Sequence, residues 1–110
     1  MLIETLSVFP ELFDPYMSAS IMGRARAKGL FDFRAHDLRD WTHDRHRTVD
    51  DAPFGGGAGM LMKVEPLHEA ITAISKQESV RPRIVFFTPC GETFTQSTAE
   101  RLSTCERILF

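Results

Sequence analysis

The stretch from Arg83 to Glu92 reads RIVFFTPCGE, and it decides between the fold classes open to this chain. RIVFF has the length and apolar character of a buried β-strand, and TPCGE holds the proline and glycine of a tight turn. TQSTAERLS follows as a predicted helix, with Thr95 placed to be its N-cap. A strand, a turn and a helix in that order form the repeating unit of a parallel α/β sheet.

The same alternation extends through the rest of the chain. Helices are predicted over residues 11–29, with Gly29 as the C-terminal stop, and over residues 65–77. The second helix places one apolar face inward, formed by Leu67, Ala70, Ile71 and Ile74. LMKV (61–64) is predicted as a short strand, and the main strands are Leu2–Phe9, Phe31–His36, Arg83–Thr88 and Arg107–Phe110. We therefore expect an α/β fold in which helices flank a parallel sheet.

Composition places the chain among ordinary globular proteins. Its 110 residues are 43% hydrophobic and 25% charged, and the formal net charge is −2. That charge argues against a protein that coats DNA, but it allows a nucleic-acid enzyme whose basic residues are clustered. Glu4 interrupts the first apolar run and no basic leader precedes it, so no signal peptide is expected. No apolar stretch approaches the roughly 20 residues that cross a bilayer, so we expect a cytoplasmic protein without a membrane partner.

A second unusual stretch, HRTVDDAPFGGGAGM, runs from His46 to Met60 and is predicted to be neither helix nor strand. Its GGGAG lacks the Lys and Ser/Thr of a Walker loop and does not open a helix after a strand, as a dinucleotide fingerprint does. What remains is backbone with few side chains, flanked by His46, Arg47, Asp50 and Asp51. Such a surface suits a flat base, with basic residues nearby for phosphates. A flexible surface loop is the alternative.

Two further features of the sequence concern ligand binding. His43 and His46, with Asp44 or Asp50, have no evident third metal ligand, and the surrounding arginines repel cations, so no metal site is predicted. TPCG lies at the carboxyl end of a strand, where ligands bind in open parallel sheets. A turn with only a geometric role is the alternative there.

Several segments occur together, in order and at a familiar spacing: LSVFPELF, SIMGRARAKGL, HDLRDWT, HRTVDDAPFGGGAGMLMK and FFTPCGETFTQ. On these segments the chain resembles the bacterial tRNA (guanine-N1)-methyltransferases of the TrmD type, over its whole length. The resemblance implies a SPOUT-type α/β methyltransferase domain with a deep trefoil knot, which binds S-adenosyl-L-methionine and works as a homodimer. It implies methylation of N1 of guanine 37 in tRNA, 3′ to the anticodon, and it allows a role for Mg²⁺.

The resemblance also assigns residues. The methyl donor would be bound by FFTPCG, that is, by Phe86, Phe87, Thr88, Pro89, Cys90 and Gly91. The family more often has Ser-Pro-Gln-Gly here, so Thr88 and Cys90 depart from its pattern, and backbone groups at position 90 are expected to matter more than the side chain. The tRNA would be bound by His46, Arg47, Asp50, Gly55, Gly56, Gly57 and Gly59, with the glycines covering the target base and the other three contacting the anticodon stem or ordering the loop.

In the family, a second glycine-rich knot loop and a helical C-terminal tRNA-binding domain follow the segment that this chain resembles. The aspartate that acts as general base and its supporting arginine would therefore lie beyond Phe110. Residues 1–110 are thus expected to be the N-terminal part of the methyltransferase domain, with an incomplete knot, no catalytic residue and no activity alone. A non-catalytic α/β nucleic-acid-binding module is the alternative.

Overall fold

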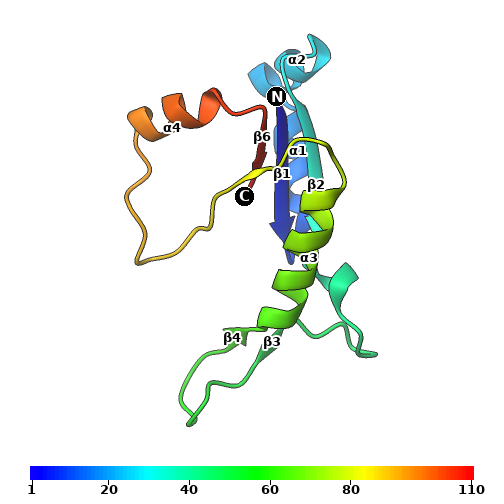
Figure 1. Ribbon diagram of the computed structural model, residues 1–110, viewed down its shortest axis with the longest axis vertical. Coiled ribbons are helices and arrows are strands. Elements are labelled where there is room, and N and C mark those ends of the chain that lie inside the picture. Colours follow the sequence, from blue (N-terminus) through cyan, green and yellow to red (C-terminus); the bar gives the residue numbers. More distant parts are fainter.

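Four parallel strands form the central sheet of the computed structural model, which describes residues 1–110 (Figure 1). Their order across the sheet is β2-β1-β6-β5, so the last strand lies between the first strand and β5. Ile3 pairs with Phe33 on one side and with Ile108 on the other. The predicted parallel α/β sheet is confirmed. The strands are β1 (Leu2–Ser7), β2 (Asp32–Asp37), β5 (Arg83–Ile84) and β6 (Arg107–Leu109).

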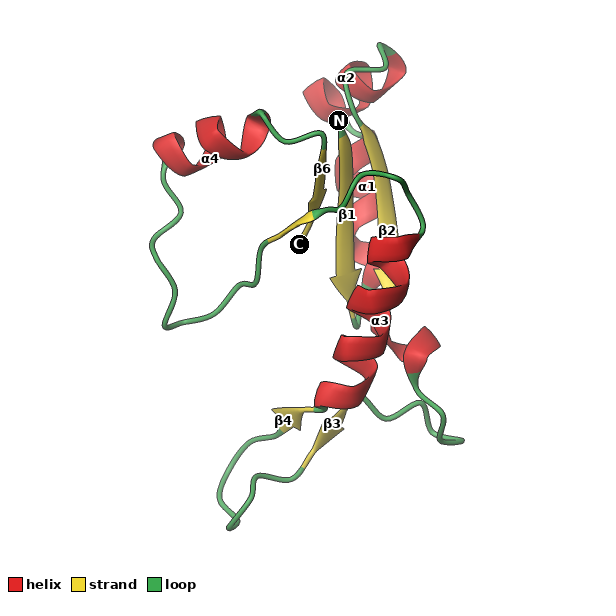
Figure 2. Cartoon of the chain, in the orientation of Figure 1, coloured by secondary structure: helices red, strands yellow, loops and turns green.

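Helices cover both faces of this sheet (Figure 2). Helix α3 (Val64–Lys76) packs Ala70 and Ile74, both fully buried, into the core of one face, as its sequence predicted. The rest of that core is Leu38, Val49 and Leu109. On the other face, Phe13 of α1 (Phe13–Ser18) packs against Phe33 with ring centroids 6.3 Å apart. The core is small because only 13 of the 110 residues are buried.

The predicted helix over residues 11–29 is wrong as one element. The chain forms a 3₁₀ turn, η1 (Pro10–Leu12), then α1 and a separate helix α2 (Ser20–Ala27), with extended backbone at Ala19 between them. A Cβ atom at Gly23 would lie 2.2 Å from the Ser18 carbonyl oxygen, so the two helices meet this closely only because position 23 is glycine. Gly29, with φ +68°, ends α2 as predicted.

Strand β5 is shorter and more exposed than predicted. It comprises two residues instead of six, and its Ile84 is 46% exposed. The physical reason is its place at the edge of the sheet, where β6 is its only partner. The ladder ends with the bond from Val85 N–H to the Leu109 carbonyl (2.8 Å), and the chain then leaves the sheet.

A buried ion pair crosses the middle of the sheet. Glu4 of β1 is fully buried and accepts a hydrogen bond from Arg107 Nε of β6 at 2.6 Å. The same guanidinium donates to the carbonyl oxygens of Ile74 (2.7 Å) and Val80 (3.0 Å), and His36 Nε2 lies 3.0 Å from Glu4 Oε1. One side-chain network therefore links β1, β2, β6 and the end of α3.

The glycine-rich stretch, predicted to contain no strand, is a β-hairpin. β3 (Asp50–Asp51) pairs antiparallel with β4 (Leu61–Met62), and the glycines form its tip. The predicted strand at 61–64 is correspondingly short because α3 begins at Val64. Before the hairpin, the 3₁₀ turn η2 (Leu38–Trp41) follows β2 directly. The last helix, α4 (Gln96–Ser103), has the predicted N-cap, since Thr95 Oγ1 accepts from Thr98 N–H at 3.3 Å.

Candidate functional site

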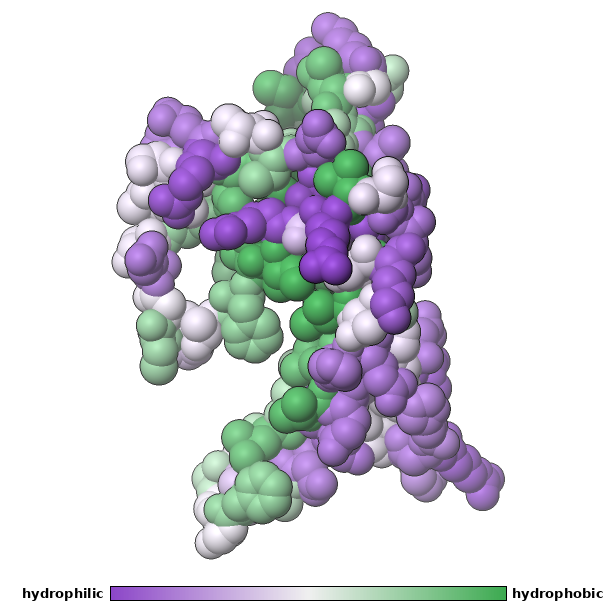
Figure 3. All heavy atoms as spheres, viewed as in Figure 1, coloured by the Kyte–Doolittle hydropathy of each residue, from purple (hydrophilic) through white to green (hydrophobic).

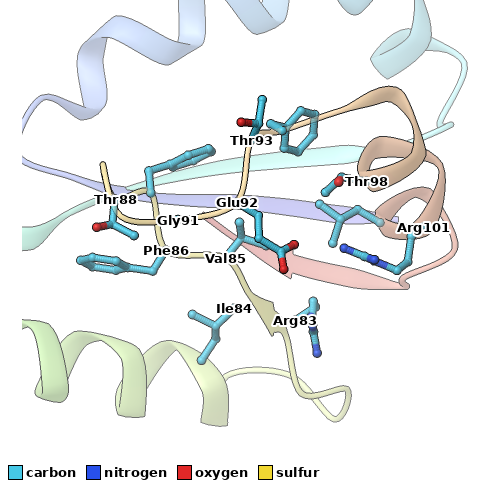
Figure 4. Close-up of a pocket in the computed structure, with 13 residues that line it drawn as sticks. Arg83, Ile84, Val85, Phe86, Thr88, Gly91, Glu92, Thr93, Thr98 and Arg101 are labelled. Atoms are coloured by element: carbon cyan, nitrogen blue, oxygen red, sulfur yellow. The ribbon is translucent and has the colours of Figure 1, made fainter.

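A cavity of about 270 Å³ lies at the carboxyl end of β5, between the connection from β5 to α4 and α4 itself (Figure 4). We call this connection, residues 85–94, the donor loop. Among the residues predicted to bind the methyl donor, Phe86, Phe87, Thr88 and Gly91 line the cavity. Pro89 and Cys90 belong to the same turn but do not line it, and Cys90 is exposed. The structure therefore brings four of the six predicted residues to one cavity.

Hydrogen bonds to Thr88 shape the turn in the donor loop. Its hydroxyl accepts from Cys90 N–H (3.3 Å) and its carbonyl accepts from Gly91 N–H (3.0 Å). A Cβ atom at Gly91 would lie 3.2 Å from that carbonyl oxygen, which is tighter than an ordinary contact. Thr88 and Gly91 thus fix the backbone of the turn, and the Cys90 side chain takes no part in it.

The cavity also has charged residues that sequence reasoning missed. Figure 4 shows Glu92 projecting from the donor loop and Arg101 from α4, while Arg83 comes from β5. Thr98 and Leu102 line the cavity beside Arg101. These three residues of α4 follow i, i+3, i+4 spacing, which puts them on one helix face. The spacing of Thr98, Arg101 and Leu102 in the sequence could therefore have indicated that they share one surface.

The tip of the hairpin consists of glycines with positive φ. The angles at Gly55, Gly56, Gly57 and Gly59 lie between 80° and 125°, a region that other residues rarely adopt. No atom lies within 4 Å of a Cβ built at any of them, so the glycines are required by the backbone and not by close packing. Phe54, beside them, is 99% exposed. The hairpin presents bare backbone and one aromatic ring to its surroundings.

The hairpin and the donor loop converge on an apolar hollow of about 200 Å³. Met62 of β4 lines it together with Phe86 and Phe87 of the donor loop, and twelve of its thirteen lining residues are hydrophobic. Leu6 and Val8, at the carboxyl end of β1, form its floor. Figure 3 shows apolar side chains gathered along this part of the molecule and at the hairpin. Met62, at the base of the hairpin, therefore lies beside the donor loop at the carboxyl edge of the parallel strands, the usual ligand edge of such sheets. The predicted tRNA-binding residues, that is, the hairpin glycines, His46, Arg47 and Asp50, line neither this hollow nor the cavity.

The remaining predicted tRNA-binding residues lie before the hairpin or in its first strand. His46 and Arg47 belong to residues 42–48, which we call the basic loop, and exposed Asp50 begins β3. Asp44 folds this loop, because its carboxylate accepts from the Thr48 hydroxyl (2.7 Å) and the Thr48 N–H (2.9 Å). These bonds lower the pKa of the Asp44 carboxyl. The loop is thus organised by its own side chains.

Two other findings concern ligands and surroundings. No three His, Cys, Asp or Glu side chains lie close enough together to hold a metal ion. None of the helices has the length and apolar character that crossing a bilayer requires.

A parallel sheet with helices on both faces, and with the donor loop and the base of the glycine hairpin at its carboxyl edge, is the fold of the SPOUT-type methyltransferases. The family described as tRNA (Guanine-1)-methyltransferase TrmD matches the chain over residues 1–110. The chain belongs to this family.

Relatives agree with that assignment. A tRNA (guanine-N(1)-)-methyltransferase of Cutibacterium acnes is 50% identical over 111 residues, which cover 100% of this chain and 46% of the relative. The enzyme of the same name from Clavibacter sepedonicus is 49% identical, with 100% and 47% covered. The crystal structure of tRNA (m1G37) methyltransferase from Aquifex aeolicus superposes with a TM-score of 0.88 at 31% identity, covering 99% of this chain and 49% of that one. The chain thus spans a little under half the length of the relatives it matches, and the knot is incomplete within it.

Proposed function

We propose that this chain is the N-terminal part of an enzyme that methylates N1 of guanine 37 in tRNA, 3′ to the anticodon, with S-adenosyl-L-methionine as the methyl donor. The observation that carries the proposal is that Met62, at the base of the glycine hairpin, lies beside Phe86 and Phe87 of the donor loop at one apolar hollow. A methyl group passes directly from donor to base, so the two binding segments must be neighbours. The relatives named for this reaction support it further.

The donor would lie against the donor loop. Phe86 and Phe87 supply apolar surface, the turn held by Thr88 presents backbone groups, and Glu92 adds a negative charge beside the cavity. S-adenosyl-L-methionine would supply a methyl group activated by its positively charged sulfur, which a carboxylate favours electrostatically. The cavity of about 270 Å³ is slightly below the range of about 300–1,000 Å³ typical of ligand pockets. It would hold part of the donor, and a further loop outside these residues would complete the site.

The target guanine would lie under the hairpin, where Gly55, Gly56, Gly57 and Gly59 let the base approach the backbone. His46, Arg47 and Asp50 would bind the tRNA or order the adjacent chain. N1 of guanine carries a proton, so methylation needs a general base. We assign that base to a part of the protein outside residues 1–110, as we do a helical tRNA-binding domain. No step is assigned to Mg²⁺.

The proposal includes a homodimer in the cytoplasm. Strand β5 leaves one edge of the sheet unpaired, and several large apolar side chains are exposed. Tyr16 of α1 and Ile21 of α2, for example, are each 69% exposed. A second copy of the protein, or the rest of the chain, would cover such surfaces.

Donor binding tests the proposal most directly. We would add S-adenosyl-L-methionine to the isotope-labelled chain and follow its amide NMR signals, with Gly91→Ala and the exposed control Ser97→Ala in parallel. We expect weak binding that shifts the signals of residues 85–94, is weakened by Gly91→Ala and is unchanged by Ser97→Ala. Shifts confined to other parts of the chain would contradict the donor site.

The second candidate is a nucleic-acid-binding module without catalysis. It is favoured by the exposed glycine hairpin and basic loop, together with the lack of an assigned general base among residues 1–110. A methyl-transfer assay on an unmodified tRNA transcript separates the two. The chain alone should be inactive under either proposal. A protein extended beyond Phe110 in its own reading frame should methylate N1 only if the enzyme proposal is right, and a lack of activity in that extended protein would favour the module.

A further inference from the structure

The basic residues between η2 and the hairpin divide into two groups. Arg39 donates to the Val8 carbonyl, and His43 Nε2 lies 2.9 Å from Glu69 Oε2 of α3. Arg47 is also engaged, as described below. Arg45 and His46, at the tip of the basic loop, are exposed, and their side chains make no hydrogen bond or ion pair. Although the net charge of the chain is negative, Arg45 and His46 are thus exposed at the tip of the basic loop without a carboxylate partner.

Arg47 holds this loop against η2. Its Nη2 lies 2.5 Å from Asp40 Oδ1 and 3.4 Å from Asp37 Oδ2, and its Nε donates to the Arg39 carbonyl at 3.3 Å. All three partners lie on η2 or immediately before it. The residue has φ +53°, a left-handed conformation that costs a non-glycine residue about 1–2 kcal/mol. These contacts engage its Nε and Nη2, offset that cost and direct the guanidinium toward η2.

The basic loop is continuous with the glycine hairpin. After Thr48 the chain buries Val49 in the core, and the Val49 carbonyl accepts from Lys63 N–H at 2.8 Å, which closes the base of the hairpin. In Figure 1 the loop and the hairpin extend from the same end of the molecule, beyond the N-terminus of α3. A nucleic acid that binds at this end of the molecule would meet both the hairpin and the loop.

We propose that the basic loop is a preformed contact for the RNA backbone, in which Arg45 at the tip binds phosphate and Arg47 is a positioning residue that fixes the loop on η2. This rests on the proposed function, because it takes tRNA as the partner. The family resemblance gave His46, Arg47 and Asp50 the role of contacting the anticodon stem or ordering the loop. Here Arg47 orders the loop, and the phosphate contact is assigned to Arg45, two residues before it. Each phosphate contact made by a basic side chain makes binding more salt-dependent, by about one unit in the slope of log affinity against log salt.

The test uses the protein extended beyond Phe110 in its own reading frame, a tRNA transcript and fluorescence anisotropy at salt concentrations from about 50 to 200 mM. Arg45→Ala should weaken binding at low salt and reduce the slope by about one unit. Arg81→Ala is the matched control, since it removes an equal charge from an exposed arginine without a side-chain partner beyond the other end of α3. It should leave the slope unchanged. Equal effects of the two variants would show that Arg45 acts only through the net charge.

Arg47→Lys tests the positioning role separately. It keeps the charge and loses the fork of contacts, so the salt slope should stay the same while the loop loosens. Trp41, the one tryptophan, belongs to η2 and reports this through acrylamide quenching without any RNA. Unchanged quenching and unchanged protease resistance of residues 42–48 in Arg47→Lys would overturn the positioning role.

The tRNA-binding measurements also distinguish a failure of the Arg45 proposal from a failure of the proposed function. If the unchanged chain binds tRNA and Arg45→Ala binds it equally well, the role of Arg45 is wrong and the proposed function stands. If the unchanged chain does not bind tRNA at any salt concentration, tRNA recognition by these residues is wrong, and the role of Arg45 is wrong with it.

Discussion

Replacing Glu4 by Gln should destabilise the protein more than any other isosteric change in the chain. Glu4 is fully buried, Arg107 is 3% exposed, and the two are joined by a 2.6 Å hydrogen bond. The substitution removes the negative charge and leaves the buried guanidinium uncompensated. Breaking such a pair from one side costs about 3–5 kcal/mol, against a total stability of about 5–15 kcal/mol for a typical domain. The melting temperature should fall by more than about 10 °C.

The assay is urea unfolding followed by Trp41 fluorescence and circular dichroism. Glu78→Gln is the matched control, because Glu78 pairs with Arg34 at a similar distance, 2.7 Å, with side chains 39% and 48% exposed. An exposed pair contributes about 0–1 kcal/mol, so the control should unfold close to the unchanged protein. Equal losses in the two variants would refute the reasoning, since burial is the only property that it uses to rank them.

A double variant keeps the prediction testable if Glu4→Gln does not fold. Replacing both Glu4 and Arg107 by Met removes the uncompensated charge and fills the site with apolar atoms. It should recover part of the loss, but not all of it, because the carbonyl oxygens of Ile74 and Val80 lose their donor. A double variant less stable than Glu4→Gln would show that the contacts to the carbonyls, and not the ion pair, hold the sheet together.

Three further predictions concern local structure. Gly23→Ala should lower stability by about 1–3 kcal/mol in urea unfolding, because its Cβ would collide with the Ser18 carbonyl oxygen at 2.2 Å; an effect below a few tenths would mean that α1 and α2 separate freely. Lowering the pH should leave the basic loop ordered to below the ordinary carboxyl pKa and then release it, because the pKa of Asp44 is lowered in the folded state by the Thr48 bonds and their stabilisation is lost only as pH falls through that lower value. NMR signals of the loop should show this, and a loss of order above about pH 5 would contradict it. Thr95→Ala should destabilise α4 by about 1 kcal/mol through loss of its N-cap, measured as faster amide exchange in that helix and not in α3.

Sequence predicted the features that depend on neighbouring residues. The inward face of α3 follows from a helical period that Ala70 and Ile74 satisfy, and the Thr95 cap follows from residues three positions apart. The turn at Thr88 and Gly91 was predicted for the same reason. The family resemblance singled out the donor loop and the glycine segment, and in the structure Met62, at the base of the glycine hairpin, lies beside the donor loop.

What sequence missed depends on residues that are distant in the chain. In the sequence Glu4 was interpreted as an interruption of an apolar strand, because its partner Arg107 lies at the other end of the sequence. β5 read as a buried strand, because nothing local reveals that its place is at the edge of the sheet. The split between α1 and α2 depends on one backbone approach, at Gly23, which a periodic pattern does not record.

The strand order also governs how the molecule assembles as it leaves the ribosome. β1 pairs with β6 through Ile3 and Ile108, and β5 has no sheet partner other than β6. At about 5–20 residues per second, roughly 100 residues take about 5–20 s to translate, and during that time one edge of β1 has no partner. β1 can pair early with β2, but the donor loop gains its anchor only when β6 emerges. Chaperones that bind nascent chains would therefore meet a two-stranded intermediate with an open apolar edge, and β5 with its following loop would join the sheet last among residues 1–110.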